Sequence, residues 1–259
     1  MTASSDFTLA RVLHKGDTVY AGWCSLPYPI IAELVGRGGF PAVVLDLQHG
    51  LWDTASILAG IAAVHQSGSA PIVRVPIGDF AMVSRALDFG AEAIIAPMIN
   101  TAADARAFVA AAKFPPMGER SWGPHRSMIF SGLAEPKVYL RKANDLTMTF
   151  AMIETRSALD NLDAIVTTPG IDGVFVGPFD LSIALTDGKS VDPDSEDVDA
   201  ALTKIAKSAN KAGKIAGVYS HTSKRTIALA KRGFRFISAG SDMGFLRAGL
   251  AATRSELKI

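Results

Sequence analysis

The sequence predicts an α/β fold, a (β/α)8 TIM barrel that forms one domain over residues 1–259. Eight short apolar segments recur along the chain, and a helix-like segment follows each of them. Strict alternation of strands and helices requires a parallel sheet, and eight such units close into a barrel. The length of 259 residues is close to the roughly 250 that this fold usually occupies. A doubly wound nucleotide-binding sheet is disfavoured because no glycine-rich fingerprint follows the first strand.

The first four strand–helix units occupy residues 18–114. Their strands contain continuous apolar runs, as is typical of parallel strands buried on both faces, and are expected at residues 18–25, 42–50, 70–76 and 91–99. Their helices are expected at residues 28–38, 53–68, 80–90 and 101–114. Asp53 and Thr101 are suitable N-caps for two of these helices. Gly68 can end the second helix, and Pro76 ends the third strand.

Residues 115–145 interrupt the alternation with a segment rich in glycine and proline. We expect mostly loop with a short helix around residues 137–142, and long loops in compact domains usually form lids, binding loops or interfaces. A polar loop at residues 186–197 also precedes the sixth helix. The remaining strands are expected at residues 147–155, 171–180, 214–221 and 235–242, and the remaining helices at 157–167, 197–213, 223–233 and 243–258.

Composition excludes several classes of function. The net charge of +1 and the scattered basic residues provide no surface for nucleic acid or anionic membranes. No run of roughly 18 apolar residues suggests a membrane span, and the polar start lacks the apolar core of a signal peptide. Cys24 is the only cysteine and cannot form an internal disulfide, so a reducing cytoplasm is expected.

Polar side chains follow the apolar segments at the end of the barrel where active sites of this fold are built. Glu154 and Asp180 follow neighbouring strands. Hard cations such as Mg²⁺ are often bound by one or two carboxylates, with water and substrate oxygens completing the shell. The two acids therefore predict a metal site with open positions for a 2-oxo acid. The alternative is a pair of acids bonded to backbone amides or arginines.

His49 follows the second strand and is the candidate base. A histidine base needs a partner that fixes its tautomer, and Asp46, three residues earlier, is the nearest acid. Arg74 stands in an otherwise apolar strand and needs an anionic partner because burying a bare charge is costly. That partner is either an enolate intermediate or a salt bridge to Asp46. His221, after the seventh strand, is a weaker candidate for substrate contact.

The sequence gives less support to other catalytic mechanisms and functions. No GxSxG elbow is present, Cys24 is expected to be a packed core residue, and no lysine ends a strand, which argues against Schiff-base catalysis. A sugar-phosphate isomerase would need a glycine-rich phosphate loop after the last strands, and SAGSD is a poor version of one. A non-catalytic binding or scaffold barrel stays open, but it should lack part of the polar set described above.

Seven motifs, LDLQHG, PIVRVP, APMI, GERSWGP, MIET, GVFVGPFDLS and SAGSD, run in order between Trp23 and Leu246. In this order and spacing, the chain resembles the HpcH/HpaI family of metal-dependent pyruvate aldolases. The resemblance implies a barrel of the phosphoenolpyruvate/pyruvate-domain type and a class II aldolase.

The resemblance also implies roles for single residues. Glu154 and Asp180 would bind Mg²⁺, Mn²⁺ or Co²⁺, all of which suit carboxylates and water. His49 would be the proton acceptor, with support from Asp46, and Arg74 would stabilise the enolate.

Asp88 corresponds to an acid that raises the basicity of the histidine in the family. The backbone of Phe179 and Asp180 would hold the pyruvyl carboxylate. Two positions depart from the pattern of relatives: Gln48 replaces a glutamate beside the base, and Met152 replaces a glutamine that contacts substrate.

The aldehyde pocket is expected to involve Trp23, Tyr219, and Ser121 and Trp122 of the GERSWGP motif, with a neighbouring subunit as a further contributor. Family members are commonly hexamers, built as trimers of dimers that exchange the C-terminal helix. The apolar stripe at residues 243–257 fits such an exchange and equally fits ordinary barrel packing.

These residues predict reversible retro-aldol cleavage of a 4-hydroxy-2-oxo acid into pyruvate, or a close analogue such as hydroxypyruvate, and an aldehyde. An oxaloacetate-type decarboxylase is the alternative, because it would use the same metal and enolate chemistry without any additional residue.

Overall fold

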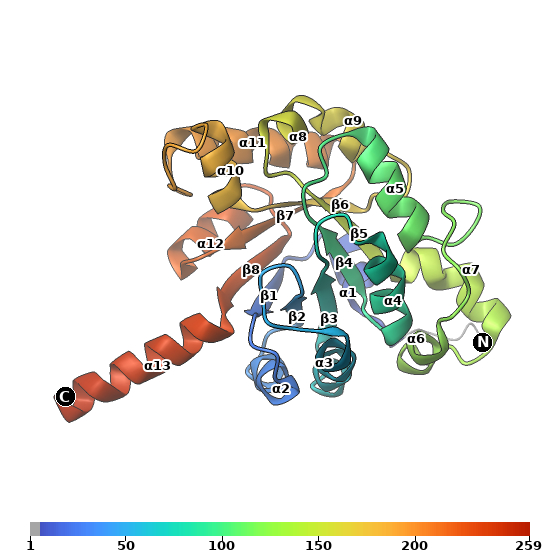
Figure 1. Ribbon diagram of the computed structural model, residues 1–259, viewed down its shortest axis with the longest axis horizontal. Helices are drawn as coiled ribbons and strands as arrows, with labels where there is room; N and C mark the ends of the chain where they lie inside the picture. The colour runs from blue at the N-terminus through green and yellow to red at the C-terminus, as the bar shows by residue number, and fades with distance from the viewer. Residues whose placement is uncertain (1–5) are drawn as a thin grey trace.

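The computed structural model describes residues 6–259, and in this range the chain forms a closed barrel of parallel strands ringed by helices (Figure 1). Each strand pairs with its neighbours in sequence, and β8 closes the barrel against β1. The expected fold class is therefore confirmed. The strands are β1 (Val19–Cys24), β2 (Ala42–Asp46), β3 (Ala70–Arg74), β4 (Ala93–Ala96), β5 (Met148–Met152), β6 (Gly173–Val176), β7 (Ile215–Ser220) and β8 (Phe236–Ser241).

The helices cover the outer surface of the barrel. Two expected N-caps are confirmed, since Asp53 and Thr101 each form a reciprocal capping box with the residue three positions later. The helices are α1 (Leu9–His14), α2 (Pro29–Arg37), α3 (Thr54–Gln66), α4 (Phe80–Phe89), α5 (Ala102–Ala112), α6 (His125–Phe130), α7 (Pro136–Leu146), α8 (Arg156–Asp160), α9 (Leu162–Val166), α10 (Pro178–Leu185), α11 (Glu196–Lys211), α12 (Ser223–Lys231) and α13 (Asp242–Leu257).

Several expected boundaries are wrong. The segment 115–145 is mostly helical rather than mostly loop, because α6 and α7 enclose a small apolar cluster around the fully buried Tyr139. The single helix expected at 157–167 is divided into α8 and α9 at Asn161. The sixth strand ends at Val176, and α10 begins at Pro178, a position that suits proline because the first helical N–H needs no partner.

Two apolar layers hold the barrel together. The inner layer contains the inward side chains of the strands, including Phe236, whose ring contacts the rings of Phe150 and Phe175. The outer layer lies between the strands and the helices. Gly217 is needed in the inner layer, since a Cβ at this position would lie 2.7 Å from the Phe175 ring. The interior is a packed core, which leaves the carboxyl end of the barrel for chemistry.

Glu92, just before β4, connects the barrel to α1, a helix that the sequence did not predict. Its carboxylate is 2% exposed and accepts the backbone N–H groups of Thr8 and Leu9, at 2.8 and 2.9 Å. Burial raises the pKa of Glu92 to about 7, although the two backbone bonds and Arg11 oppose that shift. Folding therefore favours the protonated form of this side chain.

We expect the stability of the protein to fall as the pH rises from about 4.5 to about 7 because of Glu92. In this range the native state binds more protons than the unfolded chain, so deprotonation favours unfolding. A pKa shift of this size corresponds to a change of about 3 kcal/mol in the free energy of unfolding. Urea denaturation of the wild type and Glu92→Gln at pH 5 and pH 8 tests this, and a pH-independent difference between them would contradict it.

The C-terminal helix α13 projects away from the barrel (Figure 1). Its main contacts are to β1, β8 and α2, and residues 243–259 are exposed throughout. Ordinary packing along its own barrel, one of the two interpretations of the apolar stripe, is therefore not observed. In residues 6–259, no helix combines the length and the hydropathy required to cross a membrane.

Candidate active site

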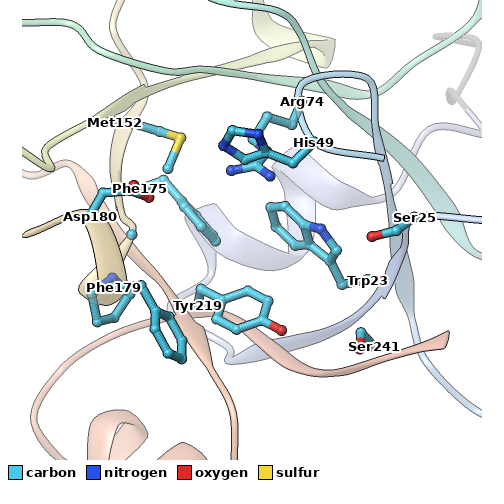
Figure 2. A pocket seen from close by; sticks show the side chains of 12 residues that line it. Trp23, Ser25, His49, Arg74, Met152, Phe175, Phe179, Asp180, Tyr219 and Ser241 are labelled. Atoms are coloured by element: carbon cyan, nitrogen blue, oxygen red, sulfur yellow. The ribbon is translucent and has the colours of Figure 1, made fainter. Parts of the chain in front are cut away.

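A pocket of about 270 Å³ opens at the carboxyl end of the barrel, a size that suits a small ligand. Figure 2 shows side chains from several strands converging on it. Many of the residues expected from sequence meet in its lining: Trp23, His49, Arg74, Met152, Phe179, Asp180 and Tyr219.

Arg74 and Asp46 form a buried ion pair at one side of this pocket. The register of β2 and β3 places the two residues directly beside each other. Arg74 Nε and Nη2 donate to Asp46 Oδ1 and Oδ2 at 2.8 and 2.6 Å, a bidentate arrangement. Burial raises the pKa of Asp46, but the bonds from Arg74 outweigh it and hold that pKa below its usual value. The salt bridge considered from sequence is thus present, and Arg74 Nη1 takes no part in it.

Trp23 supports this ion pair. Its indole N–H donates to Asp46 Oδ2 at 3.2 Å, and the Arg74 guanidinium lies 4.8 Å from the centre of its ring. Trp23 is only 4% exposed, so it holds the pair and forms the floor of the pocket.

The expected pairing of Asp46 with the His49 imidazole is not observed. Asp46 Oδ1 instead accepts the backbone N–H groups of Gln48 and His49, at 3.0 and 3.3 Å. The reason is that β2 ends at Asp46, so the following turn folds its backbone over the carboxylate. His49 is exposed and its side chain lines the pocket. Asp46 therefore places the His49 backbone and leaves the imidazole free.

Glu154 and Asp180 lie on the side of the pocket opposite Arg74 (Figure 2), and Glu154 is buried whereas Asp180 is exposed. Glu154 is 3% exposed, and its Oε1 accepts the backbone N–H of Met98 at 2.8 Å. Met98 has a φ of 56°, a strained value for a side chain of this size. Burial, together with a smaller effect of the nearby Asp180 carboxylate, raises the pKa of Glu154 to about 7, although the Met98 bond and Arg74 oppose the shift.

The space between these two carboxylates fits a metal ion. A Cβ on Gly177 would lie 2.8 Å from Glu154 Oε2 and 3.4 Å from Asp180 Oδ2, so both oxygens border a space that glycine leaves open. No cluster of three or more potential metal-binding His, Cys, Asp or Glu side chains occurs in residues 6–259. Two carboxylates with open positions match the preference of Mg²⁺ and similar ions for water and substrate oxygens.

A sequence model for the family described as HpcH/HpaI aldolase/citrate lyase matches residues 20–248. The chain belongs to this family. It is 36% identical over 235 residues to a hydroxypyruvate/pyruvate aldolase from Rhizorhabdus wittichii, covering 91% of this chain and 92% of that protein. It is 34% identical over 226 residues to a 5-keto-4-deoxy-D-glucarate aldolase from Klebsiella pneumoniae, covering 87% of this chain and 86% of that protein.

A solved structure leads to the same family. An HpcH/HpaI aldolase/citrate lyase family protein from Burkholderia cenocepacia superposes with a TM-score of 0.89 at 27% identity, covering 98% of this chain and all of that chain. Together with the relatives above, this makes the chain an aldolase. The alternative of a non-catalytic scaffold barrel is therefore wrong.

Three predicted residues of this HpcH/HpaI aldolase, Asp88, Ser121 and Trp122, lie away from the pocket and from the residues that contact its lining. Asp88, near the end of α4, binds Arg120 at 2.6 Å, and Trp122 packs against Phe114 and Tyr139. Ser121 lies beside Trp122 in the same loop. The helix α4 runs back from the carboxyl end of the barrel, so its last turn and the loop beside it lie away from the pocket.

Met152 and Tyr219 complete the pocket of this aldolase on its apolar side. Met152 is 1% exposed and replaces the expected glutamine contact with an apolar surface. The Tyr219 ring stands edge-on to Trp23, with 5.4 Å between ring centroids. Burial raises the pKa of Tyr219, partly opposed by a hydrogen bond with Ser241.

Ser25 and Phe175 also line the pocket, and the sequence did not single them out. Ser25 directly follows β1, and Phe175 points into the barrel and stacks on Trp23 at 5.9 Å. Ser25 could have been found from its place after a strand. Phe175 carries no chemical signal in the sequence, because any inward apolar residue would look the same.

Proposed function

We propose that this aldolase catalyses reversible cleavage of 4-hydroxy-2-oxo acids into pyruvate, or hydroxypyruvate, and an aldehyde, with a divalent metal as cofactor. The observation that carries the proposal is the open space bordered by Glu154 Oε2 and Asp180 Oδ2, in a pocket that Arg74 and His49 also line. The names of the relatives, hydroxypyruvate/pyruvate aldolase and 5-keto-4-deoxy-D-glucarate aldolase, support this class of substrate.

Glu154 and Asp180 would hold Mg²⁺, Mn²⁺ or Co²⁺, which when bound supplies Lewis-acid polarisation of the 2-oxo group. The substrate carboxylate would be held by backbone N–H groups of Phe179 and Asp180. These residues lie in the first turn of α10, where N–H groups have no helical partner and the helix dipole favours anions.

His49 is the proposed proton acceptor. Its exposed imidazole in the pocket can take the proton of the substrate 4-hydroxyl, and the C3–C4 bond then breaks to release the aldehyde. The electron pair of that bond remains on the pyruvyl fragment as an enolate. Protonation at C3 gives pyruvate.

Arg74 is proposed to stabilise the developing enolate. Its Nε and Nη2 are committed to Asp46, which fixes the plane of the guanidinium and leaves Nη1 for the substrate. A donor that is oriented before the reaction stabilises charge without reorganisation cost at the transition state. Asp46 and Trp23 act through Arg74 as positioning residues.

Pyruvate formation from a simple 4-hydroxy-2-oxo acid, with Mg²⁺ or Mn²⁺ and then with EDTA, tests the proposal. We expect pyruvate release with metal and none after chelation. Absence of release with substrates of several sizes, although the metal is bound, would favour the oxaloacetate-type decarboxylase or a different 2-oxo acid. Release that EDTA does not affect would contradict the metal dependence.

We also propose that α13 is exchanged between subunits of a homohexamer arranged as a trimer of dimers. The helix exposes Phe245, Leu246 and Leu250, and an apolar groove between its first turn and α2 is lined by Leu34 and Phe40. Neither surface is covered in a single subunit. The same assembly would be the route by which Ser121, Trp122 and Asp88 reach a site.

We expect a chain truncated after residue 241 to form a smaller species than the wild type in light scattering after gel filtration. An unchanged mass would contradict the exchange.

The free, buried thiol of Cys24 is in keeping with a reducing cytoplasm as the location of the protein.

A further inference from the structure

A contact between His221 and Asp194 at the mouth of the pocket has no part in the chemistry proposed above. His221 follows β7, and its Nε2 lies 3.3 Å from Oδ2 of Asp194 in the loop between α10 and α11. Both side chains are partly exposed, 31% and 51%. Exposed pairs of this kind contribute little to global stability, so a local role is the better explanation for the contact.

The imidazole of His221 also touches an aromatic side chain of the pocket. Its ring lies 5.8 Å from the ring of Phe179, which in turn lies 6.3 Å from the ring of Tyr219. Phe179 and Tyr219 line the pocket, whereas His221 stands behind Phe179. Figure 2 shows the rings of Phe179 and Tyr219 side by side at one edge of the pocket. Phe179 is therefore held between a lining residue and a residue outside the lining.

The loop that carries Asp194 is itself anchored. Arg225 of α12 pairs with Asp194 through Nε at 3.2 Å and with Asp199 of α11 through Nη2 at 2.7 Å. These contacts tie the loop to two helices of the barrel wall. Asp194 thus gives His221 a partner whose position does not depend on the pocket.

We propose that the His221–Asp194 pair is a positioning device that sets the place of the Phe179 ring and thereby limits the size of the aldehyde. This inference rests on the proposed function. A 2-oxo acid bound between Glu154, Asp180 and the start of α10 lies deep in the pocket. The fragment beyond C4 then extends toward the mouth, where Phe179 is 38% exposed. When two substrates differ by one or two carbon groups at such a contact, the ratio of their kcat/KM values changes about tenfold or more.

The test compares aldol addition of pyruvate to glycolaldehyde and to benzaldehyde in the full-length protein with Mn²⁺. In His221→Ala and Asp194→Ala we expect the kcat/KM ratio of benzaldehyde to glycolaldehyde to rise about tenfold. His221→Gln, whose amide can still donate to Asp194, should return the ratio to within about threefold of the wild type. Proton exchange at C3 of pyruvate, which needs no aldehyde, should stay within about twofold of the wild type in all three variants.

A double-mutant cycle with Phe179→Ala shows whether Phe179 transmits the effect. In that background, His221→Ala should change the ratio no further. An unchanged ratio in His221→Ala and Asp194→Ala, with normal exchange, would overturn the inference while leaving the proposed function intact. Full additivity with Phe179→Ala, or exchange that falls in parallel with aldol addition, would also overturn it. Absence of metal-dependent exchange in the wild type would instead refute the proposed function itself.

Discussion

Replacement of Arg74 with alanine is expected to lower kcat for retro-aldol cleavage by about 10²- to 10³-fold, the usual effect of removing one oriented donor to a developing oxyanion. KM should change much less, because the contact strengthens only as the enolate forms. The geometry supports this expectation, since the bidentate bond to Asp46 directs the guanidinium into the pocket. Steady-state kinetics on pyruvate release measures both constants.

The same substitution should also destabilise the fold. Arg74→Ala leaves the Asp46 carboxylate, which is 1% exposed, with only Trp23 and two backbone N–H groups as donors. Breaking a buried pair by removing one partner costs about 3–5 kcal/mol. Urea denaturation separates this loss from the kinetic effect, and kcat must be referred to the folded fraction. Equal kcat in Arg74→Ala and the wild type would refute the enolate role.

Loss of the two carboxylates should abolish metal binding and activity together. We expect Mn²⁺ to raise the Tm of the wild type, because ligand binding to the native state raises apparent stability, and we expect Glu154→Gln combined with Asp180→Asn to remove that increase. Activity should fall by about 10³-fold or more, since Lewis-acid polarisation contributes several kcal/mol. Thermal denaturation with and without Mn²⁺ measures the first effect, isothermal titration with Mn²⁺ checks the loss of binding directly, and pyruvate release measures the activity.

Gly177→Ala provides a graded version of the same experiment. The added Cβ would stand 2.8 Å from Glu154 Oε2 without changing any charge, so we expect weaker Mn²⁺ binding in a protein that still folds. The matched control for the double carboxylate variant is Asp160→Asn, which changes an exposed acid at the end of α8 to its amide. This control should bind Mn²⁺ as the wild type does. Normal Mn²⁺ binding by the double carboxylate variant would exclude this site.

The residues that could be predicted are those whose position follows from local pattern. Glu154 and Asp180 directly follow apolar segments, and the carboxyl ends of parallel strands meet at one end of a barrel. Arg74 was identifiable because a charge in an apolar strand requires a partner. Both suggested partners of Arg74, Asp46 and an enolate, are compatible with the geometry. Asp46 binds two nitrogens of the guanidinium and leaves the third for the substrate.

The prediction for His49 illustrates where local pattern is insufficient. Sequence distance suggested that Asp46 would bind the imidazole, yet Asp46 receives backbone N–H groups and the guanidinium of the next strand. Three residues of separation say nothing about whether a strand continues or turns. The end of β2 at Asp46 depends on pairing with β3, which is a contact between distant parts of the chain.

The sequence by itself determined the barrel, the order of its strands and the identity of the polar residues at its carboxyl end. Each of these depends on periodicity and on neighbours along the chain. Only the tertiary structure decided that Gly177 leaves space between two carboxylates, that Trp23 supports Arg74, and that His221 stands behind Phe179. The physical reason is that these relations are distances between residues that belong to different elements of the barrel. Packing of the whole barrel sets such distances, and no local segment encodes them.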